Sequence, residues 1–408
     1  MHAHIATLPG DGVGPEVIDE ALRVLAAVGD RFGHRFDIEY GLIGGAAIET
    51  TGHSLPVATA NLTHRAHAVL LGAVGGPKWD DPSLAERPER GLLALRRIMG
   101  TYANIRPVRV SGVARDFSPL RPERLAGVDL VVVRELTGGL YFGKKRRFTG
   151  KDGGEVASDD CTYTAAEVER VVRTAGELAR TRRRKVTSVD KANVLETSRL
   201  WRSVAEGVMR DEFPDVTYDV MLVDACAMHL MMNPARFDVI VTENLFGDIL
   251  TDEAAVIAGS IGLLPSASLG HPRTGGRRRV GLYEPIHGSA PDIAGQGKAN
   301  PVGTILSVAM MLRTSLELHD EALAVEQAVD GALEDGWRTP DITLPGPARS
   351  PPAPPRSGAE IAQRRGDAPD ARDRPAASTS TPGPRPADAA LPYERPVGRS
   401  PRASRRYT

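Results

Sequence analysis

The chain lacks the features that would place it in a membrane or in an oxidising compartment. No apolar run approaches the roughly 18 residues that a membrane-spanning helix needs. The N-terminal segment MHAHIATLPGDG has no basic stretch followed by an apolar one, as a signal peptide would have. Only two cysteines, Cys161 and Cys226, occur in 408 residues, which excludes a disulfide framework. We therefore expect a cytoplasmic protein with no membrane partner.

The chain also lacks a general surplus of positive charge. Its formal net charge is −1, but residues 344–408 hold twelve Arg, no Lys and six acidic residues, so this tail carries +6 and the remainder −7. A mildly acidic body gives no electrostatic reason to expect a nucleic-acid partner. The tail holds fourteen of the 31 prolines and few large apolar side chains, so it cannot offset the entropy of its own ordering. We expect it to be disordered.

The body contains alternating strand-like and helix-like segments, which indicate an α/β fold. Short apolar runs predict strands, and two of these runs, at 68–74 and 130–133, are continuous enough to be covered on both faces. Apolar residues at helical spacing predict the helices. The predicted strands cover residues 5–8, 68–74, 130–133, 186–189 and 239–241. The predicted helices begin near Pro15 and at 164–180, 196–210, 246–258, 301–318 and 321–334.

Two glycine-containing segments could hold a cofactor. The segment GDGVGP at 10–15 is similar to a dinucleotide-binding fingerprint, but Pro15 stands where the third glycine is needed, which favours a tight turn into a helix. Residues 281–301 hold six turn-forming residues, and a loop of that length inside a compact domain usually has a function. Its backbone N–H groups around Gly288, Ser289 and Ala290 could bind a pyrophosphate.

Acidic residues suggest a metal site. Asp248 and Asp252 are spaced i, i+4 on a predicted helix, so two like charges share one face, and a divalent cation would relieve their repulsion. Asp224, after a strand, could add a third ligand. Oxygen ligands suit Mg²⁺ or Mn²⁺ rather than zinc. A solvated acidic helix face is the alternative.

Three arginines suggest an anion site. Arg96, Arg106 and Arg134 each follow or interrupt an apolar stretch, where a guanidinium needs a carboxylate or phosphate partner. Three of them in separate segments favour a small polyanionic ligand, although structural pairing with internal acids is the alternative.

A lysine and a tyrosine could transfer protons. Lys191 follows a strand, where open α/β sheets collect ligand-binding residues, and could act as a general base or simply pair with Asp190. Tyr141 follows Gly138 and Gly139 and could be a phenolic acid or a packed aromatic residue.

Seven segments together resemble the isocitrate/isopropylmalate dehydrogenase family, in that family's order. They are LPGDGVGPEV, LLGAVGGPKWD, GLLALRRIMGTYANIRPV, VVVRELTGGLYFG, SVDKANVLE, FDVIVTENLFGDILTDEAAVIAGSIGLLPSASLG and GLYEPIHGSAPDIAGQGKANP. The resemblance covers about residues 5–340 and implies a two-domain α/β fold in which helices flank a continuous mixed sheet. Residues 1–101 and 259–343 would form the first domain, with the NAD-binding loops. Residues 102–258 would form the second, with the dimer interface and the metal and substrate residues.

The resemblance also implies the chemistry and the residues that carry it. The activity would be NAD-dependent oxidative decarboxylation of a 2-hydroxy acid, assisted by Mg²⁺ or Mn²⁺, in a homodimer with shared active sites. Lys191 would be the base and Tyr141 the acid, with Lys191 and Asp224 supplied by the partner subunit. The substrate would contact Arg96, Arg106, Arg134, Glu89, Leu92 and Asp224; the metal would bind Asp224, Asp248 and Asp252; NAD would contact Glu284, His287, Gly288, Ser289, Ala290, Asp292 and Asn300.

Two positions narrow the implied substrate and cofactor. Leu92, beside Glu89, would leave the third carboxylate of isocitrate unpaired but would suit an isopropyl group, which implies conversion of 3-isopropylmalate to 2-oxoisocaproate in leucine biosynthesis. D-malate, tartrate and homoisocitrate stay open as substrates, because an apolar pocket discriminates by only about 1–3 kcal/mol per methylene. The Asp292 carboxylate would repel the 2′-phosphate of NADP, which implies NAD.

The sequence departs from the family after Ile342, where the proline- and arginine-rich tail replaces the family's last helix. We hypothesise a reading-frame shift near Leu344, because Arg, Pro and Ala codons dominate out-of-frame translation of a GC-rich gene. The first domain would then expose apolar surface and lose on the order of several kcal/mol of stability. The alternative of another class is an inactive scaffold protein that uses the basic tail to bind an acidic partner.

Overall fold

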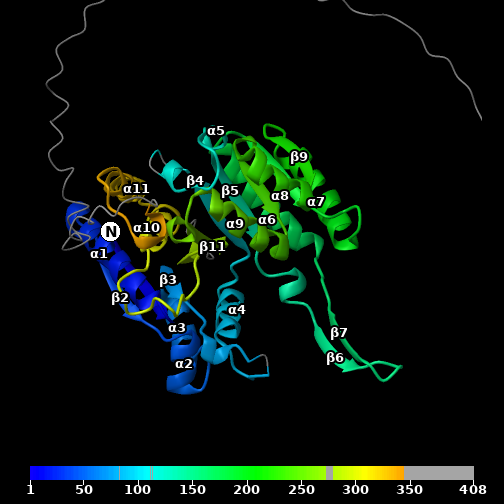
Figure 1. The fold of residues 1–408 in the computed structure, drawn as a ribbon, viewed down its shortest axis with the longest axis horizontal. Coiled ribbons are helices and arrows are strands. Elements are labelled where there is room, and N and C mark those ends of the chain that lie inside the picture. The colour runs from blue at the N-terminus through cyan, green and yellow to red at the C-terminus, as the bar shows by residue number, and fades with distance from the viewer. Residues whose placement is uncertain (82, 111, 113, 273–278, 344–408) are drawn as a thin grey trace, which may run out of the picture. The chain divides into compact units, whose positions relative to one another are not determined.

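The structure, a computed structural model, describes residues 1–343 except 82, 111, 113 and 273–278 (Figure 1). The tail at 344–408, with its expected disorder, lies outside the described residues. The strands are β1 (His2–Gly10), β2 (Arg35–Tyr40), β3 (Ala68–Ala73), β4 (Ala103–Arg109), β5 (Asp129–Glu135), β6 (Lys145–Thr149), β7 (Glu155–Asp159), β8 (Lys185–Asp190), β9 (Thr217–Leu222), β10 (Val239–Thr242), β11 (Pro265–Pro272) and β12 (Arg279–Pro285). The helices are α1 (Gly14–Phe32), α2 (Gly44–Thr51), α3 (Val57–Arg65), α4 (Pro88–Met99), α5 (Pro122–Leu125), α6 (Ala165–Arg180), α7 (Glu196–Glu212), α8 (Val223–Met232), α9 (Asn244–Ile257), α10 (Val302–Thr314) and α11 (His319–Glu334).

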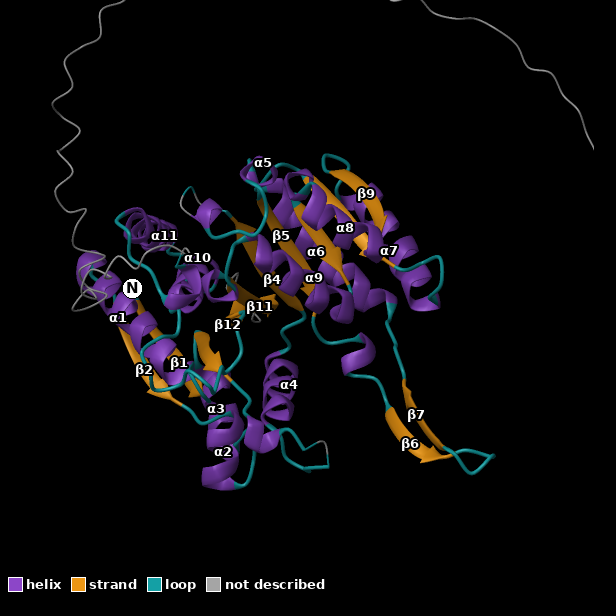
Figure 2. Cartoon of the chain, viewed as in Figure 1, coloured by secondary structure: helices purple, strands orange, loops and turns teal. Residues whose placement is uncertain are grey.

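Ten of the described strands form one sheet with helices on both faces (Figure 2). The strand order is β2-β1-β3-β12-β11-β4-β5-β10-β8-β9. Neighbours pair in parallel from β2 to β12 and from β5 to β9, and antiparallel from β12 through β11 and β4 to β5. The predicted α/β class, with a continuous mixed sheet flanked by helices, is confirmed. β6 and β7 pair only with each other, as a hairpin that extends away from the large sheet.

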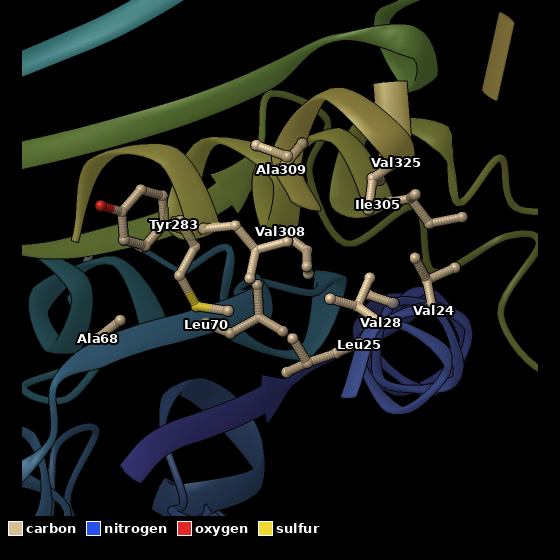
Figure 3. Packing of buried hydrophobic residues seen from close by; sticks show 14 of the residues in the cluster. Val24, Leu25, Val28, Ala68, Leu70, Tyr283, Ile305, Val308, Ala309 and Val325 are labelled. Carbon is tan, nitrogen blue, oxygen red and sulfur yellow. The ribbon is translucent and has the colours of Figure 1, made fainter. Parts of the chain in front are cut away.

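The central strands are buried on both faces, as their continuous apolar sequences predict. In β3, Leu70 belongs to an apolar cluster with α1, α10 and α11 (Figure 3), whereas Leu71 belongs to a second cluster with α3 and α4. In β5, Val131 packs with α6 and α7, and Val132 packs with α8 and α9. Successive side chains of a strand point to opposite faces, so each strand joins two helical layers.

Two predicted boundaries are wrong, each for a local reason. The helix predicted at 301–318 ends at Thr314, because the buried Ser315 hydroxyl donates to the Arg279 carbonyl at 2.6 Å and the chain turns at Glu317, whose φ is +58°. The segment 281–301 is not irregular throughout, since 281–285 continue strand β12. No helix in the described part of the chain is long and apolar enough to cross a membrane.

A groove of about 640 Å³ lies between α1 and α11, beside the point where the described chain ends. Its apolar lining includes Val17, Ile305, Val329, Leu333 and Ile342. The body thus presents apolar surface next to the last described residues.

We expect Leu70→Ala to lower the free energy of unfolding by about 2–5 kcal/mol, because the side chain is fully buried between α1 and α10 and its removal leaves a cavity. Urea denaturation followed by circular dichroism measures the change. The matched control, Leu323→Ala on α11, removes a side chain that is 47% exposed and should cost less than about 0.5 kcal/mol. Equal losses for the two variants would contradict the assignment of Leu70 to the core.

Candidate active site

Three elements bring the predicted arginines to one place. Arg96 comes from the last turn of α4, Arg106 from β4 and Arg134 from β5, and each is less than 9% exposed. β4 and β5 are neighbours, and the pair Arg106–Val132 lies two pairs along from the pair Asn104–Arg134, so both arginines are on one face of the sheet. The charges of Arg96 and Arg134 both act on Arg106. The structure therefore groups the three guanidiniums, as the anion-site interpretation requires.

Carboxylates balance the three arginines. Arg96 Nη2 donates to Glu284 Oε1 at 2.9 Å, and Arg134 Nη1 donates to Asp248. Arg106 lies 3.8 Å from Asp248 and 3.6 Å from Asp252. Three positive and three negative side chains thus form one half-buried cluster with no net charge, which makes the burial of the guanidiniums tolerable.

Burial lowers the pKa of two arginines of the cluster, and Arg106 still keeps its charge at neutral pH. Burial, followed by the neighbouring charge of Arg134, lowers the pKa of Arg106 to about 10. Burial also lowers the pKa of Arg134. The Nε atom of Arg96 is buried and has no hydrogen-bond partner among the described residues. Since buried donors are normally paired, this N–H fits an anionic ligand that brings its own acceptor.

Tyr141 stands beside the same cluster. Its hydroxyl donates to Asp248 Oδ2 at 2.6 Å, and the guanidinium of Arg134 lies over its ring at 5.5 Å from the centroid. Burial and the hydrogen bond to Asp248 raise the pKa of Tyr141 to about 12, so the phenol keeps its proton at neutral pH. The phenolic-acid interpretation therefore has a suitable geometry.

Asp248 and Asp252 lie one turn apart on α9, where the predicted metal ligands belong. The Glu243 side chain caps this helix by accepting from the Leu245 and Phe246 N–H groups. Burial raises the pKa of Asp248, but the charges of the arginines outweigh it and hold the pKa below its ordinary value. Burial and the charge of Asp248 raise the pKa of Asp252. The two carboxylates offer the hard oxygen ligands that Mg²⁺ and Mn²⁺ prefer.

The third predicted metal ligand is not brought to this pair within one chain. Among the described residues, no group of three or more His, Cys, Asp or Glu side chains is placed to hold a metal ion. Asp224, in the first turn of α8, instead accepts from Lys191, and this hydrogen bond lowers the pKa of Asp224. The alternative partner for Lys191, Asp190, is wrong, because Asp190 is buried and accepts from Arg202 at 2.7 and 2.9 Å.

Helix α4 presents the predicted substrate residues on one face. Glu89, Leu92 and Arg96 are spaced i, i+3 and i+7, so they lie above one another along the helix. Glu89 is exposed, and Leu92 is half-buried against the apolar cluster beneath α4. An apolar side chain therefore lies one turn from the Arg96 guanidinium.

The predicted NAD loop packs against the glycine turn before α1. The Val13 N–H donates to the Ser289 carbonyl at 2.8 Å, and a Cβ added to Gly12, whose φ is +59°, would lie 2.0 Å from that oxygen. Only glycine fits such an approach. The two glycine-containing segments, separate in the sequence, thus meet in the fold.

The loop holds a polar atom that fits a ligand. His287 Nδ1 lies 2.9 Å from the Gly288 carbonyl and donates to it. Its Nε2 is buried and has no partner within the described part of the chain. Burial lowers the pKa of His287, so the ring stays neutral and Nε2 is left as an acceptor.

The other predicted cofactor residues are spread along the segment from β12 to the start of α10. Glu284 ends β12 beside Arg96, Ala290 has a positive φ of +37°, and Asp292 is exposed. Asn300 donates to Asp341 at 3.0 Å and accepts from the Val302 N–H at 3.0 Å.

Sequence reasoning missed several polar residues that hold this site together. The pattern Asn-x-Arg in β4 and the Asn at the start of α9 were visible, but nothing in the sequence showed which partner each would meet. These residues are Asn104, Asn244, Thr251 and Asp341.

The fold and this site define a β-decarboxylating type of dehydrogenase. The family model described as isocitrate/isopropylmalate dehydrogenase matches residues 4–349, and the chain belongs to that family. A 3-isopropylmalate dehydrogenase from Rhodopirellula baltica is 56% identical over 342 residues, which are 84% of this chain and 93% of the relative. One from Carboxydothermus hydrogenoformans is 57% identical over 343 residues, 84% of this chain and 90% of the relative.

Solved structures agree with the family. An isocitrate dehydrogenase from Methylococcus capsulatus has a TM-score of 0.74 at 35% identity, covering 89% of this chain and 97% of that one. A beta-decarboxylating dehydrogenase from Thermococcus kodakarensis, in its apo form, has a TM-score of 0.68 at 37% identity, covering 88% and 95%.

We expect Mn²⁺ to raise the melting temperature of the protein by about 4–8 °C at a concentration about 100 times its Kd, because the cation binds the folded state only. Differential scanning fluorimetry measures the shift. Asp248→Asn should remove most of it, whereas Asp335→Asn, an exposed acid at the end of α11, should leave it unchanged. A full shift in the Asp248 variant would place the cation elsewhere.

Proposed function

We propose that this chain catalyses the oxidative decarboxylation of 3-isopropylmalate to 2-oxoisocaproate (4-methyl-2-oxopentanoate) in leucine biosynthesis, with NAD and Mg²⁺ or Mn²⁺. The observation that carries the proposal is the neutral cluster of three arginines and three acids next to an apolar residue on α4. A metal dication and a substrate dianion add to such a cluster as a neutral pair, so neither leaves an uncompensated buried charge. The names of the relatives support this substrate over D-malate, tartrate or homoisocitrate.

The arginines orient the substrate. Arg96, Arg106 and Arg134 bind its two carboxylates by their planar, bidentate guanidiniums, and the unpaired Arg96 Nε gains an acceptor. Leu92, one turn before Arg96, contacts the isopropyl group. Glu89 lies on the same face of α4, a further turn before Leu92, at the edge of the substrate site. The carboxylates displace the protein's own acids from the guanidiniums.

Two side chains move protons. Lys191 accepts the proton of the substrate hydroxyl, and a bound NAD would supply the hydride acceptor for C2. Asp248 and Asp252, with Asp224 of a second copy, would hold Mg²⁺ or Mn²⁺, which would supply a Lewis acid that makes loss of CO₂ easier. Tyr141 then gives its proton to the carbon that CO₂ has left, and its raised pKa of about 12 ensures that the phenol is protonated when needed.

Glu284 in β12 and residues of the loop after this strand hold the cofactor. His287 Nε2 offers a buried acceptor, and the N–H groups of Gly288, Ser289 and Ala290 would donate to phosphate oxygens. Asp292 accepts from the ribose hydroxyls, and Glu284 and Asn300 bound the site at its two ends. A carboxylate at the ribose favours NAD over NADP because it repels a 2′-phosphate.

A second copy of the chain completes each site. On α8, Asp224 shares a face with Met228 and Met232, which are 60% and 51% exposed. On α9, Asp252 shares a face with Ile249 and Val256, which are 59% and 47% exposed. Each of these two exposed apolar stripes, Met228 with Met232 and Ile249 with Val256, therefore lies beside a proposed metal ligand on the same helix face. Pairing the stripes of two copies buries the apolar side chains and brings Asp224 and Lys191 of one copy to Asp248 and Asp252 of the other.

The proposed division into two domains follows the grouping of the apolar clusters. Residues 1–101 and 259–343 supply the apolar clusters around α1, α4, α10 and α11, and residues 102–258 supply most of those around α6 to α9. The β11–β4 pairing then joins the two domains. We place the enzyme in the cytoplasm, where Cys161 and Cys226 remain free thiols.

We expect the purified protein to form NADH from 3-isopropylmalate and Mn²⁺, with the reaction abolished by chelator and much slower with D-malate, tartrate or homoisocitrate. Absorbance at the NADH band measures the rate. Lys191→Ala should lower kcat by about 10²–10⁴-fold while NAD binding persists. Lys185→Ala, at the other end of the same strand, should leave kcat unchanged. Faster turnover of D-malate, tartrate or homoisocitrate would show that this acid, and not 3-isopropylmalate, is the substrate. Full activity of the Lys191 variant would show that the lysine has no part in the mechanism.

A complementation experiment tests the shared site. Lys191→Ala and Asp248→Asn should each be inactive, but denaturing them together and refolding should restore about a quarter of wild-type activity. Half of the dimers are then mixed, and each mixed dimer has one intact site if Lys191 and Asp248 of the site come from different copies. Activity that stays at the level of the separate variants would contradict a shared site.

A further inference from the structure

Two arginines of the cluster, Arg106 and Arg134, each donate hydrogen bonds to the side-chain oxygen of an asparagine. Arg134 donates through Nε at 3.0 Å and through Nη2 at 2.7 Å to the single oxygen Asn244 Oδ1. Arg106 donates through Nε at 2.7 Å to Asn104 Oδ1. Both asparagines are fully buried. These contacts leave Arg134 Nη1 to donate to Asp248, whereas Arg106 Nη1 donates to Thr251 at 2.6 Å and lies 3.6 Å from Asp252.

Each asparagine is itself fixed in orientation. Asn104 Nδ2 donates to Ser266 Oγ and Ser268 Oγ, both at 3.0 Å, on the neighbouring strand β11. The sheet register sets this arrangement, since Asn104 lies opposite Ser268 on one side and Arg134 on the other. The amide nitrogen is therefore occupied, and the oxygen must face the guanidinium.

Asn244 has an equally complete set of partners. Its Nδ2 donates to the Gly138 carbonyl at 3.1 Å, and its backbone N–H donates to the Tyr163 hydroxyl at 3.0 Å. Tyr163 in turn donates to Glu243, the residue that caps α9. A rotation of Asn244 would break three buried hydrogen bonds, so Arg134 has one orientation.

The lack of charge on the two anchors, Asn104 and Asn244, matters as much as their geometry. A carboxylate in either place would bind a guanidinium more strongly than an amide does, because the hydrogen bond would join two ions. It would also cancel a positive charge that the site needs for its anion. Arg96 makes the contrast clear: it is paired with the Glu284 carboxylate, and its Nε has no partner among the described residues.

We propose that Asn104 and Asn244 are positioning residues that fix Arg106 and Arg134 while leaving their full charge for a dianionic substrate. This inference rests on the proposed function for the identity of that substrate, but its physical content concerns any dianion. Neutral anchors keep the cluster balanced at three positive and three negative side chains. One added carboxylate would make the cluster net negative. Binding of an anion would then become weaker, and binding of a cation would become stronger.

Asn104→Asp and Asn104→Ala separate charge from structure. The aspartate keeps the acceptor for Arg106 and can accept from both serine hydroxyls, whereas alanine removes the anchor but adds no charge. We expect Asn104→Asp to raise the KM for 3-isopropylmalate by about 10- to 100-fold, the equivalent of a charge-assisted hydrogen bond, and by more than Asn104→Ala does. The KM for NAD should stay within about twofold, and Asn61→Asp, an exposed residue on α3, should behave as wild type.

Ligand-induced shifts in melting temperature provide a readout that does not depend on turnover. In Asn104→Asp the shift caused by sulfate, an inorganic dianion, should fall, while the shift caused by Mn²⁺ should stay equal or grow. A purely structural role would weaken both together, or would let the isosteric aspartate rescue what alanine loses; either result overturns the proposal. If the wild type turns over no acid in the panel, the proposed function fails, yet opposite changes in the sulfate and Mn²⁺ shifts would still support the positioning role.

Discussion

The rest of the site depends on one electrostatic constraint, the balance of charge in a half-buried cluster. Arg96, Arg106 and Arg134 face Glu284, Asp248 and Asp252, and the energy of removing any one of them from water is offset by the opposite charges and by neutral hydrogen-bond partners. A lone dication or a lone dianion would upset this balance, whereas the two together preserve it. If the proposed function holds, the constraint implies that metal and substrate bind together.

The fold supplies that cluster through ordinary packing. Strands covered by helices on both faces fix the sheet, and the antiparallel strands β4 and β11 put a row of polar side chains where the two halves of the sheet meet. Helix α4 brings Glu89 and Arg96 to this row along one of its faces, and α9 brings Asp248 and Asp252. Apolar burial thus holds rigid the elements that carry the charges.

Much of this arrangement could be predicted from the sequence. Continuous apolar runs predicted strands β3 and β5, and the i, i+4 spacing of Asp248 and Asp252 predicted a shared helix face. The alternative pairing of Lys191 with Asp190 was wrong because Arg202, twelve residues later and one helix away, competes for that carboxylate. The anchors Asn104 and Asn244 could not be predicted, because their partners depend on strand register and on a loop that returns from Gly138. Local pattern identifies the charged groups, and only the tertiary fold identifies what orients them.

A crystal structure with Mn²⁺ and 3-isopropylmalate tests the central claim most directly. The account predicts an anomalous peak between Asp248 and Asp252 of one copy and Asp224 of a second, with both substrate carboxylates on Arg96, Arg106 and Arg134. A metal bound away from these aspartates, or a substrate whose carboxylates do not touch the arginines, would contradict it.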